Sequence, residues 1–303
     1  MPKIHQFAKD MNRAALAADT LALGVHWIYD PGRVAALFNF DPRPMAPQPD
    51  SYHRQAAKGG FTHFGDQIMV LLESVSELKT FSLPDWADRW RLLFHNYKGY
   101  MDHATQDTLA NFAAGLPLAE VGSQSRDMAP AGRLAPLYLV YDGQEKQLLT
   151  WAREQASLTT RHPLILELVE FWAALQHRVL EGADIPSALT AAEIHLKDAE
   201  LRRLYRAGLD SAAEADSTAV ITGFGASCDA FQMFPGLLHL ALRYSAQPRE
   251  AMTQSILGSG DNATRTTLIG TLMAAAYGAS FMPPFWYEGV SQRARIEVYL
   301  ANV

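Results

Sequence analysis

Apolar side chains recur at intervals of three and four residues over most of the chain, a spacing typical of amphipathic helices. The clearest case is residues 64–79, which carry Ile68, Met69, Leu71, Leu72, Val75 and Leu78. Further helices are predicted over residues 6–27, 84–97, 104–115, 134–140, 144–156, 163–180, 186–206 and 231–244. No run of alternating β-branched residues indicates a sheet. The pattern predicts an all-α fold, a single compact multi-helix domain of about a dozen helices over residues 1–303.

Residues 258–278 combine a polar start with a helix of small residues. The start reads Gly-Ser-Gly-Asp-Asn-Ala-Thr-Arg, and Asp261 or Asn262 is suited to cap the helix that follows. Gly270, Ala274 and Gly278 recur every four residues and form a stripe against which another helix can pack closely. The start can be a plain cap of a core helix, or a ligand site at the positive end of the helix.

Two stretches interrupt the helical pattern. Residues 38–61 contain four prolines together with Tyr52 and His53, and are either a binding loop or a surface excursion. Residues 121–133 are the second irregular stretch. Asp30-Pro31-Gly32 is expected to end the first helical segment with a turn. Ser227-Cys228-Asp229 can be a nucleophile site or a helix start, and without a histidine partner pattern the helix start is favoured.

Composition narrows the class of protein. Hydrophobic residues make up 49% and charged residues 19%, which indicates a globular chain. The net charge of −6 is dispersed, so neither nucleic acid nor an anionic membrane is an expected partner. The one cysteine excludes an internal disulfide and a cysteine-based metal site. No signal-peptide core or membrane-length apolar run is present, so we expect a soluble, cytoplasmic protein.

Several short motifs occur in a fixed order along nearly the whole chain. Residues 18–26 read Ala-Asp-Thr-Leu-Ala-Leu-Gly-Val-His, residues 62–67 read Thr-His-Phe-Gly-Asp-Gln, and residues 259–264 read Ser-Gly-Asp-Asn-Ala-Thr. Between them lie Arg-Leu-Ala-Pro-Leu at 133–137 and Thr-Thr-Arg-His-Pro at 159–163. The ordered set resembles the ADP-ribosylglycohydrolase family, in particular its branch related to jellyfish J1 crystallin.

The resemblance implies a compact helical fold that holds two magnesium ions and cleaves the glycosidic bond between ADP-ribose and an acceptor. The family's paired aspartates, however, fall here on His63 and Phe64. A further family aspartate falls on Ala263, and the glutamate of the first helix on His26. The resemblance thus implies a hydrolase of ADP-ribosyl or related N-/O-glycosidic bonds with a degenerate dimetal site. The alternative is a catalytically inactive, crystallin-like or nucleotide-ligand-binding protein.

The carried-over metal ligands are Asp261, Thr264 and Thr62, which can hold at most one weakly bound Mg²⁺ through waters. Candidate catalytic groups are Asp261, Asp66 and His63. The alternatives are that Asp261 is only an N-cap, that Asp66 complements the helix dipole, and that His63 is a core histidine.

The expected substrate is an ADP-ribose-like small molecule or an ADP-ribosylated molecule. Its candidate binding residues are Thr62, Gln67, Asn262, Thr264, Arg265 and His26. Arg265 can pair with Asp66 or Asp261, bind a phosphate, or lie on the surface, as most arginines do. Trp27, Tyr29, Tyr52 and Trp286 are candidates for adenine stacking, although core packing is favoured for the two tryptophans. Asp19 is expected to support structure near the site.

Overall fold

The computed structural model describes residues 2–303, and within that range the chain forms helices and no β-strand. The first half contains α1 Pro2–Leu23, α2 Pro31–Phe38, α3 His63–Leu78, α4 Leu83–His95, α5 His103–Ala113, α6 Ala129–Gly132, η1 Ala135–Leu139 and α7 Glu145–Ser157. The second half contains α8 Pro163–Leu180, α9 Ile185–Ala192, η2 Glu193–His195, α10 Ala199–Asp210, η3 Ser211–Ala213, α11 Ser217–Phe224, α12 Ala230–Arg243, α13 Pro248–Leu257, α14 Asn262–Tyr277, α15 Pro284–Glu288 and α16 Arg293–Ala301. The all-α prediction is confirmed.

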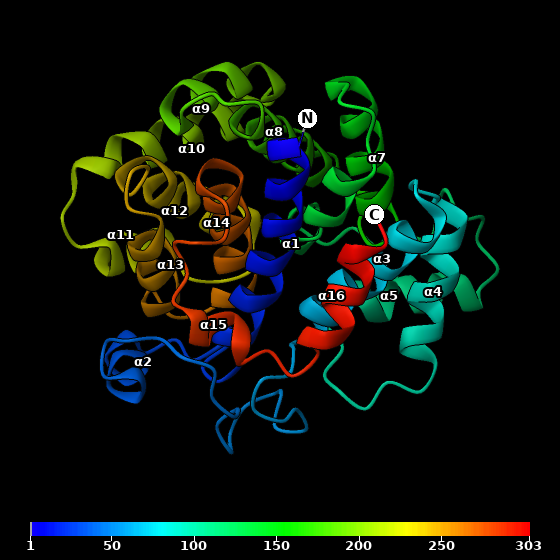
Figure 1. The fold of residues 1–303 in the computed structure, drawn as a ribbon, viewed down its shortest axis with the longest axis horizontal. Coiled ribbons are helices and arrows are strands. Elements are labelled where there is room, and N and C mark those ends of the chain that lie inside the picture. The colour runs from blue at the N-terminus through cyan, green and yellow to red at the C-terminus, as the bar shows by residue number, and fades with distance from the viewer. Residues whose placement is uncertain (1) are drawn as a thin grey trace.

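Two helices far apart in sequence form the centre of the molecule. In Figure 1, α1 (blue) and α14 (orange) lie side by side, and their contacts are the most extensive between any two described elements. A methyl group added at Gly270 would lie 3.4 Å from the carbonyl oxygen of Ala14, so the small-residue stripe lets the two backbones approach. The predicted role of the stripe is therefore confirmed.

Most of the predicted helices are present, including those at 104–115, 144–156 and 231–244, whereas α1 lies about four residues before its predicted bounds. Helices α3, α4 and α8 begin and end within about two residues of the predicted positions, as periodic segments should. Asp30-Pro31-Gly32 does not simply end a segment, because Asp30 caps α2 and Pro31 is its first residue. Helices α11, α13 and α16 were also not predicted, and the predicted helix at 186–206 is divided into α9 and α10.

Aromatic residues of α4 and α15 lie inside the core. Trp86, Trp90 and Phe94 recur every four residues on α4, and the two tryptophans are fully buried and Phe94 nearly so. Trp286 is also fully buried and donates a hydrogen bond to the carbonyl oxygen of Pro42 at 2.8 Å. It is therefore a packing residue, and no face is free for a nucleobase.

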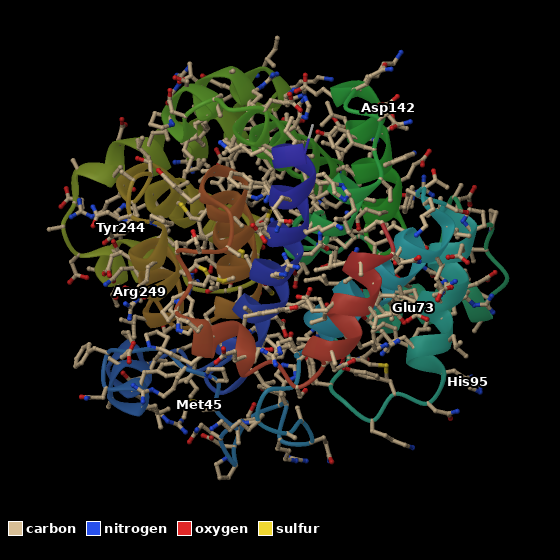
Figure 2. All side chains as sticks on the ribbon, in the orientation of Figure 1. Met45, Glu73, His95, Asp142, Tyr244 and Arg249 are labelled. Atoms are coloured by element: carbon tan, nitrogen blue, oxygen red, sulfur yellow. The ribbon has the colours of Figure 1, made fainter. Side chains whose placement is uncertain are left out.

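The irregular segment between α2 and α3 crosses the end of α1. Figure 2 labels Met45 in this segment, and a methyl group added at Gly24 would lie only 2.0 Å from Met45 Cγ. Figure 2 also shows Glu73 on α3 beside α16, where it accepts a hydrogen bond from Arg295 at 2.6 Å. None of the described helices is long and apolar enough to span a membrane.

Candidate functional site

The start of α3 is held by a buried carboxylate on α1. Asp19 is fully buried and accepts hydrogen bonds from the Thr62 N–H at 2.8 Å, the Thr62 hydroxyl at 2.6 Å and the Gly65 N–H at 3.1 Å. Thr62 in turn caps α3 by accepting from the Phe64 N–H. Burial raises the pKa of Asp19 to about 7, against the opposing hydrogen bonds from Thr62. Asp19 is therefore structural, as expected, and it engages the Thr62 hydroxyl.

The next two candidates of this motif are also engaged in contacts within the protein. Asp66 accepts a hydrogen bond from the Tyr97 hydroxyl at 2.5 Å, and burial raises its pKa. Gln67 accepts from Trp90 and from Arg133, both at 2.9 Å, and donates to the His63 carbonyl. The structure therefore gives both residues packing roles and brings neither carboxylate nor amide into contact with Asp261.

The start of α14 differs, because polar atoms remain free there. Asp261 is the N-cap of α14, and its Oδ1 accepts from the Thr264 N–H at 3.1 Å. Its Oδ2 and the Thr264 hydroxyl have no hydrogen-bond partner among the described residues, although both side chains are buried. Burial raises the pKa of Asp261. Unsatisfied buried oxygens of this kind indicate a site for a ligand, water or ion.

Arg265 lies inside the protein, which contradicts the surface alternative. Its side chain is 1% exposed and donates to the carbonyl oxygens of Ser255 and Ser259, at 2.8 and 2.6 Å from Nη2. No ion pair joins it to Asp66 or Asp261 in the described part of the chain. The guanidinium therefore fixes the loop that precedes α14.

Three buried histidines lie next to Asp261. The rings of His26 and His53 are 5.3 Å apart, and those of His53 and His63 stack at 5.4 Å. His26 Nδ1 is 3.7 Å from Asp261 Oδ1, and 3.4 Å from Asn262 Oδ1. Burial lowers the pKa of His26, and lowers that of His53 to about 3 with a contribution from the charge of His63.

His63 faces a carboxylate that the sequence analysis did not select. Its Nε2 is 3.6 Å from Oδ2 of Asp102, the N-cap of α5, which is ion-pair distance but too long for a hydrogen bond. Neither ring nitrogen of His63 has a hydrogen-bond partner among the described residues. Burial opposes ionisation of Asp102, but His63 and the Thr105 N–H outweigh it and lower its pKa to about 2. The site thus contains two imidazole–carboxylate pairs, His26–Asp261 and His63–Asp102, with His53 between them.

Aromatic rings surround this histidine cluster. Trp27 contacts the rings of His26, His53 and Tyr52, and Tyr100 contacts both Trp27 and Tyr52. Tyr52 is 62% exposed, so this aromatic rim (Trp27, Tyr52 and Tyr100) reaches from the buried imidazoles to the surface. Trp27 also has a positive φ of 64°, which is uncommon for a large side chain. The loop backbone is held there by hydrogen bonds with Gly260.

Asp127 and Cys228 also lie close to Asp261. Atoms of Asp127, Cys228 and Asp261 all lie within 4.8 Å of one another. Burial and the charge of Asp261 raise the pKa of Asp127 well above its usual range. Next to them, a small cavity of about 10 Å³ is lined by Asp102, Asp127 and Arg133 among others, and is of the size that holds about one water molecule.

The residues present do not fit a pair of magnesium ions. Mg²⁺ requires near-octahedral oxygen ligands. At the α3 start the positions expected to hold carboxylates are His63 and Phe64, and the Thr62 hydroxyl is bound to Asp19. At the α14 start Ala263 is fully buried and offers no ligand. Of the expected ligands, only Asp261 and Thr264 keep free oxygens, and these are too few to hold two ions.

The structure therefore brings together Asp261, Asn262, Thr264, His26 and His63. Asp66 and Arg265 lie nearby, but their hydrogen bonds go to Tyr97 and to two backbone carbonyls. Sequence reasoning missed the roles of Asp102 and Asp127, and left His53 only as a loop residue. Asp102 lies just before the predicted helix at 104–115 and is the N-cap of α5, a pattern that indicates a cap as readily as a site. Asp127 lies in an irregular stretch, where spacing carries no information on contacts.

Comparison with known proteins agrees with this architecture. The family model described as ADP-ribosylglycohydrolase matches residues 8–303. Crystallin J1A of Tripedalia cystophora is 26% identical over 312 residues, which cover 96% of this chain and 95% of the crystallin. Crystallin J1B of the same organism is 24% identical, over 97% and 96% of the two chains. A solved structure, an ADP-ribosylglycohydrolase-related protein complex, superposes with a TM-score of 0.75 at 24% identity over 100% and 98% of the chains. The chain belongs to the ADP-ribosylglycohydrolase family.

Proposed function

We propose that the chain hydrolyses the glycosidic bond of an ADP-ribosyl or related nucleotide-sugar substrate by imidazole–carboxylate chemistry, without a magnesium pair. The observation that carries this proposal is the His63–Asp102 pair at 3.6 Å, beside Asp261 and behind the aromatic rim. Family membership supports a substrate that contains ADP-ribose. A carboxylate that faces one ring nitrogen orients an imidazole so that its other nitrogen can transfer a proton.

In this proposal His63 performs the proton transfer. Asp102 lies 3.6 Å from Nε2 and stabilises the charged imidazolium, while the unpartnered Nδ1 takes a proton from the water that attacks the ribose carbon. The imidazolium then gives this proton to the leaving acceptor as the glycosidic bond breaks. Asp261 and Thr264 offer the free oxygens that can accept and donate hydrogen bonds to ribose hydroxyls. The side-chain oxygen of Asn262 lies next to His26 Nδ1 in the same site. A weakly held Mg²⁺ on Asp261 and Thr264 stays a prediction, and the proposed reaction does not require it.

The aromatic rim supplies the recognition of the base. Tyr52 and Tyr100 stand edge-to-face with Trp27, and an adenine ring can stack on such side chains. The site is closed in this conformation, since Asp261 and His63 are fully buried. The segment that carries Tyr52 and His53 must therefore move to admit a substrate.

A second candidate is a crystallin-like protein that has kept the fold and lost turnover. The observation that favours it is the same closure: the imidazoles fill the site, and the adjoining cavity has a volume of only about 10 Å³. The full-length similarity to crystallins J1A and J1B points in the same direction. In this case the protein neither binds ADP-ribose nor releases it from a substrate.

The two candidates are separated by an assay on peptides ADP-ribosylated at arginine or serine, with and without EDTA. We expect release of ADP-ribose that EDTA does not abolish and that falls at least about 100-fold in His63→Gln. The matched control is His103→Gln, an exposed histidine on α5, which should keep full activity. Activity that depends on added Mg²⁺ would overturn the proposed chemistry. Absence of both turnover and ADP-ribose binding would favour the crystallin-like role.

A further inference from the structure

We infer that Asp127, Cys228 and Asp261 form a binding site for a single divalent metal ion of the Zn²⁺ type. One oxygen or sulfur atom of each residue lies within 4.8 Å of the other two. Ligand atoms about 2.0–2.3 Å from one tetrahedral zinc ion are about 3.3–3.8 Å apart, so the three side chains must draw together by at most about 1.5 Å to coordinate it. This inference does not depend on the proposed hydrolysis.

Three separate segments supply the ligands, and backbone hydrogen bonds tie these segments together. Asp127 precedes α6, and its Oδ1 accepts from the Ala129 N–H at 2.7 Å. The Cys228 carbonyl accepts from the Met128 N–H at 3.2 Å, which fixes the thiol beside Asp127. The Asp261 N–H donates to the carbonyl of Ala226 at 2.7 Å. The three side chains are therefore held in a preformed arrangement, as a metal site requires.

No arginine forms an ion pair with Asp127 or Asp261 among the described residues. Arg126, the residue before Asp127, pairs with Asp229 instead. Arg133 donates to Gln67, Gln155 and Thr159, and Arg265 donates to two backbone carbonyls. Among the described residues, only the His26 imidazole lies within ion-pair distance of Asp261, and no cationic group lies within that distance of Asp127. Buried charges in proteins are normally paired or coordinate a metal.

A second observation points to a ligand at this place. Asp261 Oδ2 is fully buried and has no hydrogen-bond partner among the described residues, while Oδ1 is occupied by the Thr264 N–H. The buried hydroxyl of Thr264, one turn into α14, is likewise unpartnered. A cation bound by Asp261 Oδ2 would satisfy the carboxylate that the protein leaves incomplete.

The donor set determines the kind of metal. Thiolate is a soft ligand that selects zinc and similar ions, whereas Mg²⁺ prefers a shell of six oxygens. Three protein ligands leave one position of a zinc tetrahedron open for water or another small ligand. Cys228 binds as the thiolate, so its thiol proton is released to solvent when the sulfur–metal bond forms. This inference departs from the sequence expectation that one cysteine excludes a cysteine-based metal site, because a mixed site needs only one cysteine.

Cobalt is a suitable spectroscopic probe, because Cys228 is the only cysteine of the chain and any thiolate signal has one origin. The full-length protein, stripped with EDTA and dialysed, is titrated with Co²⁺. We expect a near-ultraviolet thiolate-to-cobalt charge-transfer band that saturates at one ion per chain and is abolished by added Zn²⁺. The band should be absent in Cys228→Ser, and the affinity should fall at least about tenfold in Asp127→Asn. The control Asp88→Asn changes an exposed aspartate of α4 and should bind like the parent protein.

A second measurement uses the unaltered protein and so avoids variants that fail to fold. Cys228 is partly exposed, so its alkylation by iodoacetamide can be followed by mass spectrometry. We expect Zn²⁺ to slow alkylation at least about tenfold and Mg²⁺ to leave the rate unchanged. Equal protection by both ions, Co²⁺ binding without a charge-transfer band, or a band that survives in Cys228→Ser would overturn the inference.

Discussion

The starts of α3 and α14 are two polar helix N-termini that differ in how far the hydrogen-bonding groups of their side chains are satisfied. At α3, the Thr62 hydroxyl is bound to Asp19, and Gln67 is bound to Trp90 and Arg133. At α14, Asp261 keeps one free oxygen and Thr264 keeps a free hydroxyl. Both starts are buried and both are capped, so local sequence makes them look alike.

The difference shows how a family site can be divided between structure and chemistry. At the α3 start Thr62 and the Gly65 N–H have become part of the packing, because Asp19 from α1 accepts their hydrogen bonds, and only the His63 ring stays unsatisfied. The α14 start keeps unsatisfied polar atoms, which cost stability unless a ligand, water or ion completes them. Substitutions at Thr62 and Gln67 should therefore mainly affect folding, whereas those at the α14 start and at His63 should mainly affect binding or activity.

The largest effect is expected from Asp19→Ala. The substitution leaves three buried donors of Thr62 and Gly65 without their acceptor, at about 1–3 kcal/mol for each unsatisfied group. We expect the free energy of unfolding to fall by about 3–5 kcal/mol, measured by urea denaturation with circular dichroism. A loss below about 1 kcal/mol would show that Asp19 does not hold the start of α3.

Gly65→Ala tests the same contact from the other side. The new methyl group would lie 2.3 Å from Asp19 Oδ2 and 2.9 Å from Phe61 Cβ, so the carboxylate must move. We expect a loss of about 1–3 kcal/mol, although alanine favours helix more than glycine does. The control is Gly236→Ala on α12, where the nearest atom is 3.7 Å away and the change should be neutral or stabilising. Equal changes in stability for both variants would contradict the proposed contact between Asp19 and the start of α3.

A pair of threonine substitutions compares the two helix starts directly. Thr62→Val removes the cap of α3 and a hydrogen bond to Asp19, and should cost about 1–3 kcal/mol. Thr264→Val removes a hydroxyl with no partner among the described residues, and should change stability by less than about 0.5 kcal/mol. Thermal and urea unfolding measure both. A cost at Thr264 equal to that at Thr62 would remove the distinction between the two starts.

At neutral pH the smallest expected effect is that of His53, which appears only as a dependence of stability on pH. Burial and the charge of His63 lower the folded-state pKa of His53 from 6.5 to about 3. Between these values the unfolded chain binds a proton that the folded chain does not, so stability is lost as pH falls below 6.5. His53→Phe should reduce the slope by about 1.4 kcal/mol per pH unit in this window.

Urea midpoints measured across the same pH range in the parent protein and in His53→Phe test this prediction. His103→Phe, at an exposed position on α5, is the matched control and should leave the slope unchanged. An unchanged slope in His53→Phe would mean that His53 is protonated in the folded protein.

The order of motifs predicted the family and the all-α fold because these properties depend on patterns along the whole chain. It also identified Asp261 as the cap of α14 and Asp19 as a structural residue. The surface position that is usual for arginine was wrong for Arg265, because its guanidinium is buried and binds two backbone carbonyls. Short helices such as α2 and α11 were missed, because few turns give a weak periodic signal.

The sequence by itself determined the helical periodicity, the close packing of α14 through its small residues, and the loss of family carboxylates at His63, Phe64 and Ala263. Only the tertiary structure decided which polar groups meet. Asp102, Asp127 and Cys228 lie in segments far apart in the chain, and packing of those segments brings them against His63 and Asp261. The physical reason is that a cap or a loop residue has the same local pattern whether its free atoms face water or another buried side chain.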